Sequence, residues 1–134
     1  MLVGFFIAAA VLVAPAALSA ESFDGTYTGS VSCPAFPNQA PLHLDMSVTV
    51  TERKATYQLT ASGELTGVLE RGGGPVSDAG LIVLAGSCEG GFSCFAEYRG
   101  ELSATPVKLT GTQRWWFRSG ERERPCEAEL SRQK

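Results

Sequence analysis

The stretch from Leu42 to Val50 constrains the fold more than any other, because its apolar and polar residues alternate without a break. Successive side chains of a β-strand point to opposite faces, so this pattern predicts a strand with one buried face. Residues 55–61 repeat the alternation, and a reversal at Glu52-Arg53 makes a hairpin in which apolar residues face each other. The predicted apolar pairs are Val50 with Ala55, Val48 with Tyr57, Met46 with Leu59 and Leu44 with Ala61.

No stretch of useful length shows a helical period, and the other apolar runs also predict strands. The expected strands are 22–33, 42–50, 55–61, 65–69, 81–85, 92–102, 107–118 and 122–130. About eight strands in meander order predict an all-β antiparallel fold that curls into an up-and-down barrel or a tightly curled sheet. A two-sheet sandwich is the alternative.

Three connections determine how these strands pair. A three-residue turn at 62–64 sets Tyr57 against Leu69, and residues 71–75 are expected to form a glycine-rich loop. The dipeptide Ser119-Gly120 predicts a two-residue turn that sets Trp115 against Arg124 and Phe117 against Arg122. Residues 81–85 are apolar on both parities, which predicts a strand covered on both faces.

The first twenty residues are expected to be a cleaved signal peptide, followed by one domain over residues 21–134. Residues 2–14 are uncharged and apolar, Pro15 interrupts them, and small residues at 17–20 suit cleavage. The apolar run is too short to span a bilayer comfortably, which takes about 20 residues. This pattern predicts a periplasmic or secreted protein with no stable membrane span after cleavage.

The four cysteines predict two disulfides, because an even number behind a signal peptide is typical of an oxidising compartment. Four cysteines allow three pairings. In a closed meander of even strand number, Cys33 at the end of the first strand lies beside Cys126 early in the last. Cys88 and Cys94 flank the tight segment Glu89-Gly90-Gly91. We therefore expect Cys33–Cys126 and Cys88–Cys94.

Charge and ligand types exclude several classes of function. The net charge is −3, which argues against a general nucleic-acid binder. The cysteines lack metal-ligand spacing and the chain has one histidine, so neither a metal site nor a cofactor is expected. His43 with Asp45, or the pair Glu127 and Glu129, are the candidate catalytic groups, but their strand positions favour solvated surface residues. No catalytic residue is predicted.

The candidate binding site is a cluster of Trp115, Phe117, Arg122 and Arg124 on the apolar face near a strand end. Cation–π stacking that plugs the barrel is the structural interpretation. The functional interpretation is a barrel mouth with aromatic walls and a positive rim for a small anionic or aromatic ligand.

Three segments carry a resemblance: FDGTYTGSVSC at 23–33, LTGTQ at 109–113 and CEAEL at 126–130. With them the chain resembles small uncharacterised secreted or periplasmic all-β proteins of bacteria, a group without assigned activity. Its strand plan is similar to lipocalin and avidin barrels in plan only. We therefore expect a non-enzymatic domain that binds a small ligand or an envelope protein. The alternative is an inhibitor of a secreted hydrolase that uses residues 71–75 or the Cys88–Cys94 loop.

Overall fold

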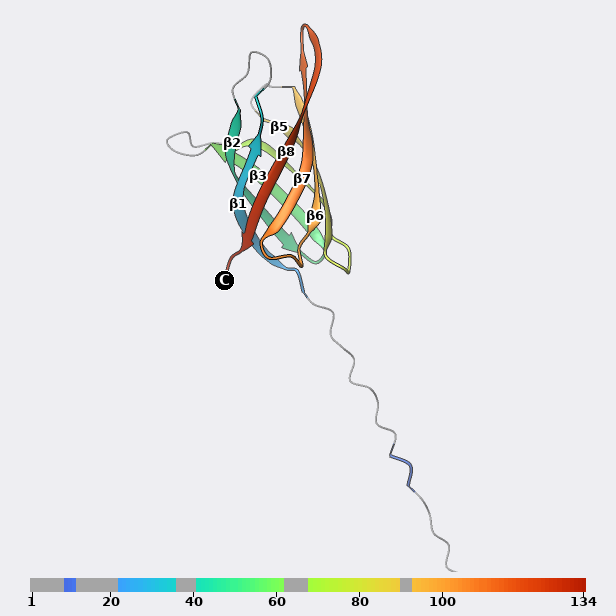
Figure 1. Cartoon of the computed structure of the whole chain (residues 1–134). Coiled ribbons are helices and arrows are strands. Elements are labelled where there is room, and N and C mark those ends of the chain that lie inside the picture. Colours follow the sequence, from blue (N-terminus) through green and yellow to red (C-terminus); the bar gives the residue numbers. More distant parts are fainter. Residues whose placement is uncertain (1–8, 12–21, 36–40, 62–67, 90–92) are drawn as a thin grey trace, which may run out of the picture.

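Eight antiparallel strands close into one barrel in the computed structural model, which describes residues 9–11, 22–35, 41–61, 68–89 and 93–134 (Figure 1). The strands follow chain order around the barrel, and β8 completes it by pairing with β1. The predicted eight-stranded meander is thus confirmed as a barrel, and the sandwich is excluded. The strands are β1 (Gly25–Cys33), β2 (Leu42–Thr51), β3 (Lys54–Ala61), β4 (Val68–Pro75), β5 (Leu81–Cys88), β6 (Cys94–Glu101), β7 (Val107–Phe117) and β8 (Gly120–Arg132).

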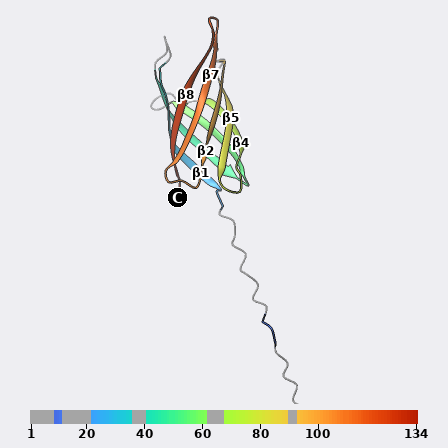
Figure 2. The same cartoon turned by 45° about the vertical axis from the view of Figure 1, so that its right-hand side comes forward.

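The two ends of the barrel are named by what lies there. At the disulfide end, β1, β3, β5 and β7 finish, and the β7–β8 hairpin extends beyond the other strands (Figures 1 and 2). At the opposite, terminal end, the chain enters the barrel after Ser22 and leaves it towards Lys134. The described ranges contain no helix, and therefore no helix able to cross a membrane.

The β2–β3 hairpin has the register that the alternating pattern predicts. All four apolar pairs, from Val50–Ala55 to Leu44–Ala61, lie opposite each other. The turn residues Glu52 and Arg53 have φ values of 49° and 63°, as a tight reversal between twisted strands requires. The backbone N–H of Glu52 donates a 3.0 Å hydrogen bond to Asp24, which ties this turn to the start of β1.

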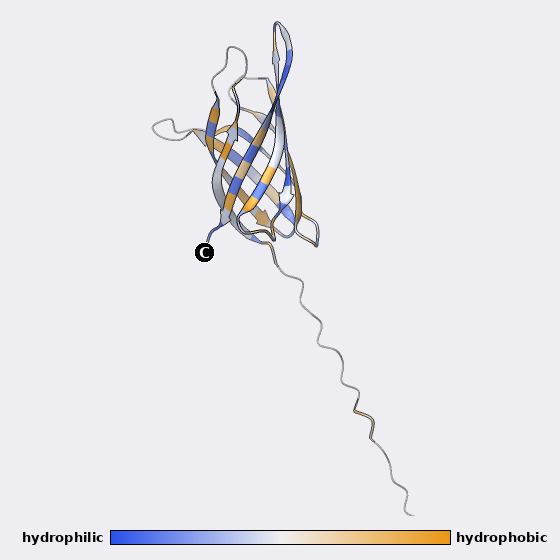
Figure 3. Ribbon diagram, in the orientation of Figure 1, coloured by the Kyte–Doolittle hydropathy of each residue, from blue (hydrophilic) through white to orange (hydrophobic). Residues whose placement is uncertain are grey.

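One parity of each strand fills the barrel, and hydrophobic and hydrophilic residues alternate along the ribbons in Figure 3. The rings of Tyr57 and Tyr98 meet edge to face in the interior, 5.5 Å apart between centroids. Glycine leaves the room that they need: a Cβ at Gly86 would lie 2.2 Å from the Tyr57 hydroxyl, and one at Gly111 would lie 2.8 Å from the Tyr98 ring. The inward glycines therefore position two tyrosines.

Both predicted disulfides are present. Cys33 and Cys126 join the end of β1 to β8, with Cα atoms 4.4 Å apart. Cys88 and Cys94 join β5 to β6, with Cα atoms 5.2 Å apart. The first bond crosses the seam at which the barrel closes, and both lie at the disulfide end.

The structure corrects the predicted pairing of β3 with β4. Residues 71–75 are not a loop but the second half of β4, and Tyr57 lies opposite Gly72 instead of Leu69. The predicted turn at 62–64 lies outside the described residues. A bulge between Leu59 and Thr60 shifts the register. A bulge re-aims side chains on the bulged strand, and here Leu69 faces outward while Glu70 faces the interior.

Two further predictions need correction. The turn of the β7–β8 hairpin falls at residues 118–119, so Trp115 lies opposite Arg122 and Gln113 opposite Arg124. Each β7 residue therefore pairs with a β8 residue two positions earlier than predicted. This change of register keeps each side chain on its expected face, because the strand period is two. In β5 only one face is buried: Leu81 and Val83 on the outer face are 49% and 39% exposed.

Candidate functional site

A buried carboxylate, Glu70, organises the interior at the disulfide end and is 1% exposed. Its Oε1 accepts hydrogen bonds from the hydroxyls of Tyr57 and Tyr98, at 2.8 and 3.0 Å. Its Oε2 accepts one from Nε2 of Gln113, at 3.0 Å. These donors come from β3, β6 and β7, so one carboxylate on β4 connects to three other strands across the barrel interior.

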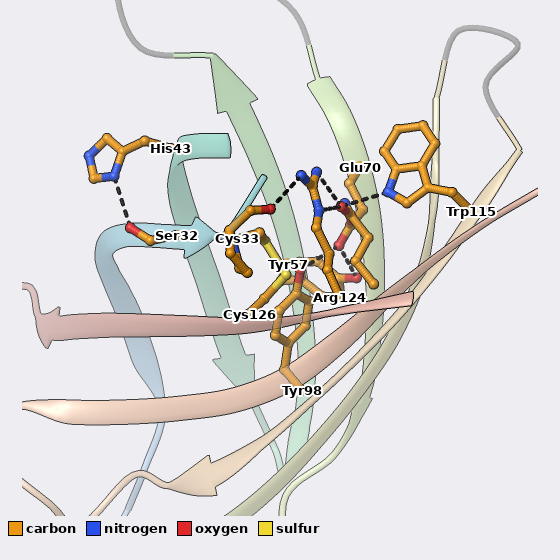
Figure 4. The surroundings of a disulfide bond; sticks show 11 residues. Ser32, Cys33, His43, Tyr57, Glu70, Tyr98, Trp115, Arg124 and Cys126 are labelled. Carbon is orange, nitrogen blue, oxygen red and sulfur yellow. Dashed lines mark hydrogen bonds between the residues drawn. A yellow bond between two sulfur atoms is a disulfide. The ribbon is translucent and has the colours of Figure 1, made fainter. Parts of the chain in front are cut away.

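Gln113 connects this carboxylate to Arg124 and Trp115 (Figure 4). Its Oε1 accepts bonds from Nε and Nη2 of Arg124, at 2.9 and 2.8 Å, and from the Trp115 indole N–H, at 2.8 Å. Arg124 also donates from Nη1 to the carbonyl of Pro34, at 3.1 Å. Opposite charges on Glu70 and Arg124 therefore share one buried network, which is how charge is tolerated inside a small core.

Burial shifts the proton equilibria of this network. It raises the pKa of Tyr57 and of Tyr98 above the ordinary value of 10.0, and the adjacent Glu70 carboxylate raises both further. Burial lowers the pKa of Arg124, while Tyr98 and Glu70 act in the opposite direction. Both tyrosines are therefore protonated hydrogen-bond donors at neutral pH.

A cavity of about 220 Å³ lies against this network. Glu70, Gln113 and Trp115 are among its lining residues. The other lining residues are apolar or sulfur-containing: Leu42, Leu44, Leu69 and Cys88. An engineered apolar cavity of about 150 Å³ accommodates benzene, so this volume suits one aromatic ring or a short alkyl chain.

The predicted cluster is divided between two environments. Arg124 is buried at 3% exposure inside the barrel. Trp115 is half-buried at the cavity, and its ring stacks on Phe117 with 6.2 Å between centroids and 9° between planes. Arg122 lies opposite Trp115, is exposed, and donates to the carbonyl of Glu121 at 3.1 Å. Three members thus form the inner face of the projecting hairpin, and Arg124 lies at its base.

The candidate catalytic groups lie outside the barrel. His43 is exposed and its Nδ1 is 3.0 Å from the hydroxyl of Ser32 on β1 (Figure 4). A serine hydrolase also needs an acid that orients the histidine, and in the described part of the chain no carboxylate is hydrogen-bonded to His43. Glu127 and Glu129 are exposed on β8 and face outward.

One group of potential metal ligands occurs within the described ranges. A carboxylate oxygen of Glu70 and the sulfurs of Cys88 and Cys94 lie within 4.8 Å of one another. The two sulfurs are joined in a disulfide, and the thiolate is the form that binds metals. In this oxidised state the group therefore lacks two of its three ligands.

Comparisons with models of known protein families, with curated protein sequences and with solved structures found no match in any of the three. The geometry of the disulfide end is therefore the basis for a functional assignment. Sequence reasoning selected Trp115 and Arg124 but not Glu70 or Gln113, because a bulge sets the facing of Glu70 and the hairpin register places Gln113 opposite Arg124. The sequence signal that could have found them is a polar residue with strand-forming residues on both sides.

Proposed function

We propose that this chain is a non-enzymatic, secreted or periplasmic binding protein that holds the apolar or aromatic part of a small ligand at the disulfide end. The 220 Å³ cavity, with apolar walls and Trp115 at one side, carries this proposal. Ligand sites in proteins are mostly apolar concavities with a few fixed polar groups. Here Gln113 and Glu70 lie beside the cavity, and hydrogen bonds hold both in place.

The proposed secreted or periplasmic location rests on the cysteines and on the apolar N-terminal segment. Two disulfides suit an oxidising compartment outside the cytoplasm. The apolar run at residues 2–14 supports an exported precursor.

The two tryptophans provide a matched test of the cavity. Trp115 lines it, whereas Trp116 is 49% exposed on the opposite face of the same strand. In Trp116→Phe, the remaining indole should report a neutral aromatic probe, phenylacetamide, by a shift in emission. In Trp115→Phe, the remaining indole should not respond. Leu42→Phe, which adds volume at the wall, should weaken binding of the probe several-fold.

Equal responses from the two single-tryptophan proteins would contradict a site at the cavity. Native mass spectrometry of protein purified from its own host would then complement the probe, because it detects a retained small molecule directly. A folded protein that carries no molecule and binds no aromatic probe would refute the proposal.

The second candidate function is inhibition of a secreted hydrolase, and the projecting β7–β8 hairpin is the observation that favours it. Trp116 and Phe117 are exposed near its tip, beside Arg118. Trp and Arg are over-represented among residues that dominate protein interfaces. Residues 71–75 no longer serve this hypothesis, because they lie within β4. Stoichiometric capture of a hydrolase from envelope extract, lost in Trp116→Ala, would favour inhibition over ligand binding.

A further inference from the structure

Charge is segregated between the two faces of the β7–β8 hairpin. On the outer face, Arg114 forms ion pairs with Glu121 at 2.8 Å and with Glu123 at 3.3 Å. On the inner face, Arg122 lies opposite Trp115. Within the described ranges, no carboxylate lies within 4 Å of the Arg122 guanidinium. The hairpin thus places Glu121 and Glu123 on the side that faces away from the cavity, where both pair with Arg114.

The charged residues inside the barrel balance one another. Glu70 and Arg124 carry opposite charges and share hydrogen bonds with Gln113, so the network beside the cavity has no net charge. Arg122 therefore brings a positive charge, without an ion-pair partner among the described residues, to the face of the hairpin that carries Trp115. The whole chain carries −3.

The distance between Trp115 and Arg122 determines what kind of molecule could contact both the cavity and Arg122. Residues directly opposite in an antiparallel pair have Cβ atoms about 4.5–5.5 Å apart. Trp115 forms part of the cavity wall and Arg122 is its direct partner across the hairpin. An apolar group in the cavity and an anionic group at Arg122 would therefore be separated by a short linker of a few bonds.

We propose that the ligand is a small anionic amphiphile: an aryl or short alkyl carboxylate with its apolar group in the cavity and its carboxylate at Arg122. This inference rests on the proposed ligand site and specifies the ligand class. A guanidinium binds a carboxylate in a two-point geometry. The Trp115–Phe117 stack forms the apolar side of the path between the two.

Matched pairs of probes separate charge from shape. We would measure affinities for phenylacetate and phenylacetamide, and for hexanoate and hexanamide, by calorimetry at low salt. The carboxylate should bind about tenfold more tightly than its amide. Arg122→Gln should remove this advantage and leave amide binding unchanged. Raising the salt concentration should reduce the advantage too, because Arg122 is exposed.

Two control variants make the same change in net charge. Arg114→Gln alters the outer face and Arg118→Gln alters the turn, so both should keep the preference for carboxylates. Equal affinity of acid and amide for the native protein would overturn the inference while the binding proposal stands. A preference that survives Arg122→Gln, or falls equally in all three variants, would also overturn it. If neither member of either pair binds, both proposals fail.

Discussion

At the terminal end, Phe23 packs against Gly80, and the other inward residues are apolar, including Val50, Val76 and Leu102. At the disulfide end, the interior holds Glu70, Gln113 and Arg124 beside a cavity. The interior of the first end is held by apolar contacts, whereas buried hydrogen bonds and two disulfides hold the second. A small barrel therefore accommodates buried polar residues at one end because covalent bonds and the opposite apolar core compensate for them.

Among the changes that test this comparison, removal of the Cys33–Cys126 disulfide at the seam should have the largest effect on stability. The Cys33–Cys126 bond spans 93 residues and the Cys88–Cys94 bond spans 6. In the chain-entropy model the long loop corresponds to about 4.7 kcal/mol and the short one to about 2 kcal/mol. Denaturant unfolding of Cys33→Ala/Cys126→Ala should show the larger loss. A greater loss in Cys88→Ala/Cys94→Ala would contradict the role assigned to the seam.

Truncating one apolar residue at each end tests the difference in packing. Phe23→Ala should lower the free energy of unfolding by about 4 kcal/mol, since it empties a packed position. Leu44→Ala, at the wall of the existing cavity, should cost about 2 kcal/mol, at the low end of such changes. Urea denaturation of both variants measures the difference. Equal losses would mean that the two ends are packed alike.

Alkaline pH should act on the disulfide end through Tyr57 and Tyr98. Their folded pKa values are raised, so above pH 10 the unfolded chain loses protons that the folded barrel keeps. Their contribution is complete below about pH 10 and is lost as pH rises, at about 1.4 kcal/mol per pH unit for each tyrosine. The expected loss at pH 11 is about 3 kcal/mol.

Phenolate absorbance during alkaline titration is the second measurement for this prediction. The chain has three tyrosines, and the signals of Tyr57 and Tyr98 should appear together with unfolding. In Tyr57→Phe the slope of stability against pH should fall by half. Ionisation of these two tyrosines near pH 10 in the folded protein would show that the Glu70 network does not control them.

The two ends also differ in how well sequence reasoning predicts them. Alternation in residues 42–50 and 55–61 predicts the β2–β3 hairpin pair by pair, because a one-residue slip would bury polar side chains. The number and order of the predicted strands indicate a barrel or a curled sheet, and the closed form predicts the Cys33–Cys126 disulfide. Where burial is apolar and regular, hydrophobic pattern determines register.

Register at the disulfide end depends on interactions that hydropathy does not encode. Matching apolar residues places Leu69 inside, yet Glu70 faces the interior, opposite Leu59, where Tyr57, Tyr98 and Gln113 satisfy its carboxylate. The bulge that permits this arrangement cannot be recognised from the pattern of apolar residues. Similarly, the β7–β8 turn lies one residue earlier than predicted and the register changes by two, which leaves facing unchanged and places Arg124 opposite Gln113.

Pairing of β8 with β1 brings the two ends of the folded chain together. The guanidinium of Arg132 donates to the carbonyl of Ser22 at 3.2 Å, and the N–H of Gln133 donates to the carbonyl of Thr26 at 2.8 Å. A short linker would therefore connect these ends and allow circular permutation, with new termini opened at residues 118–119. A reporter domain fused at that opening would sit next to Trp115 and the cavity, while the terminal end of the barrel would stay unmodified.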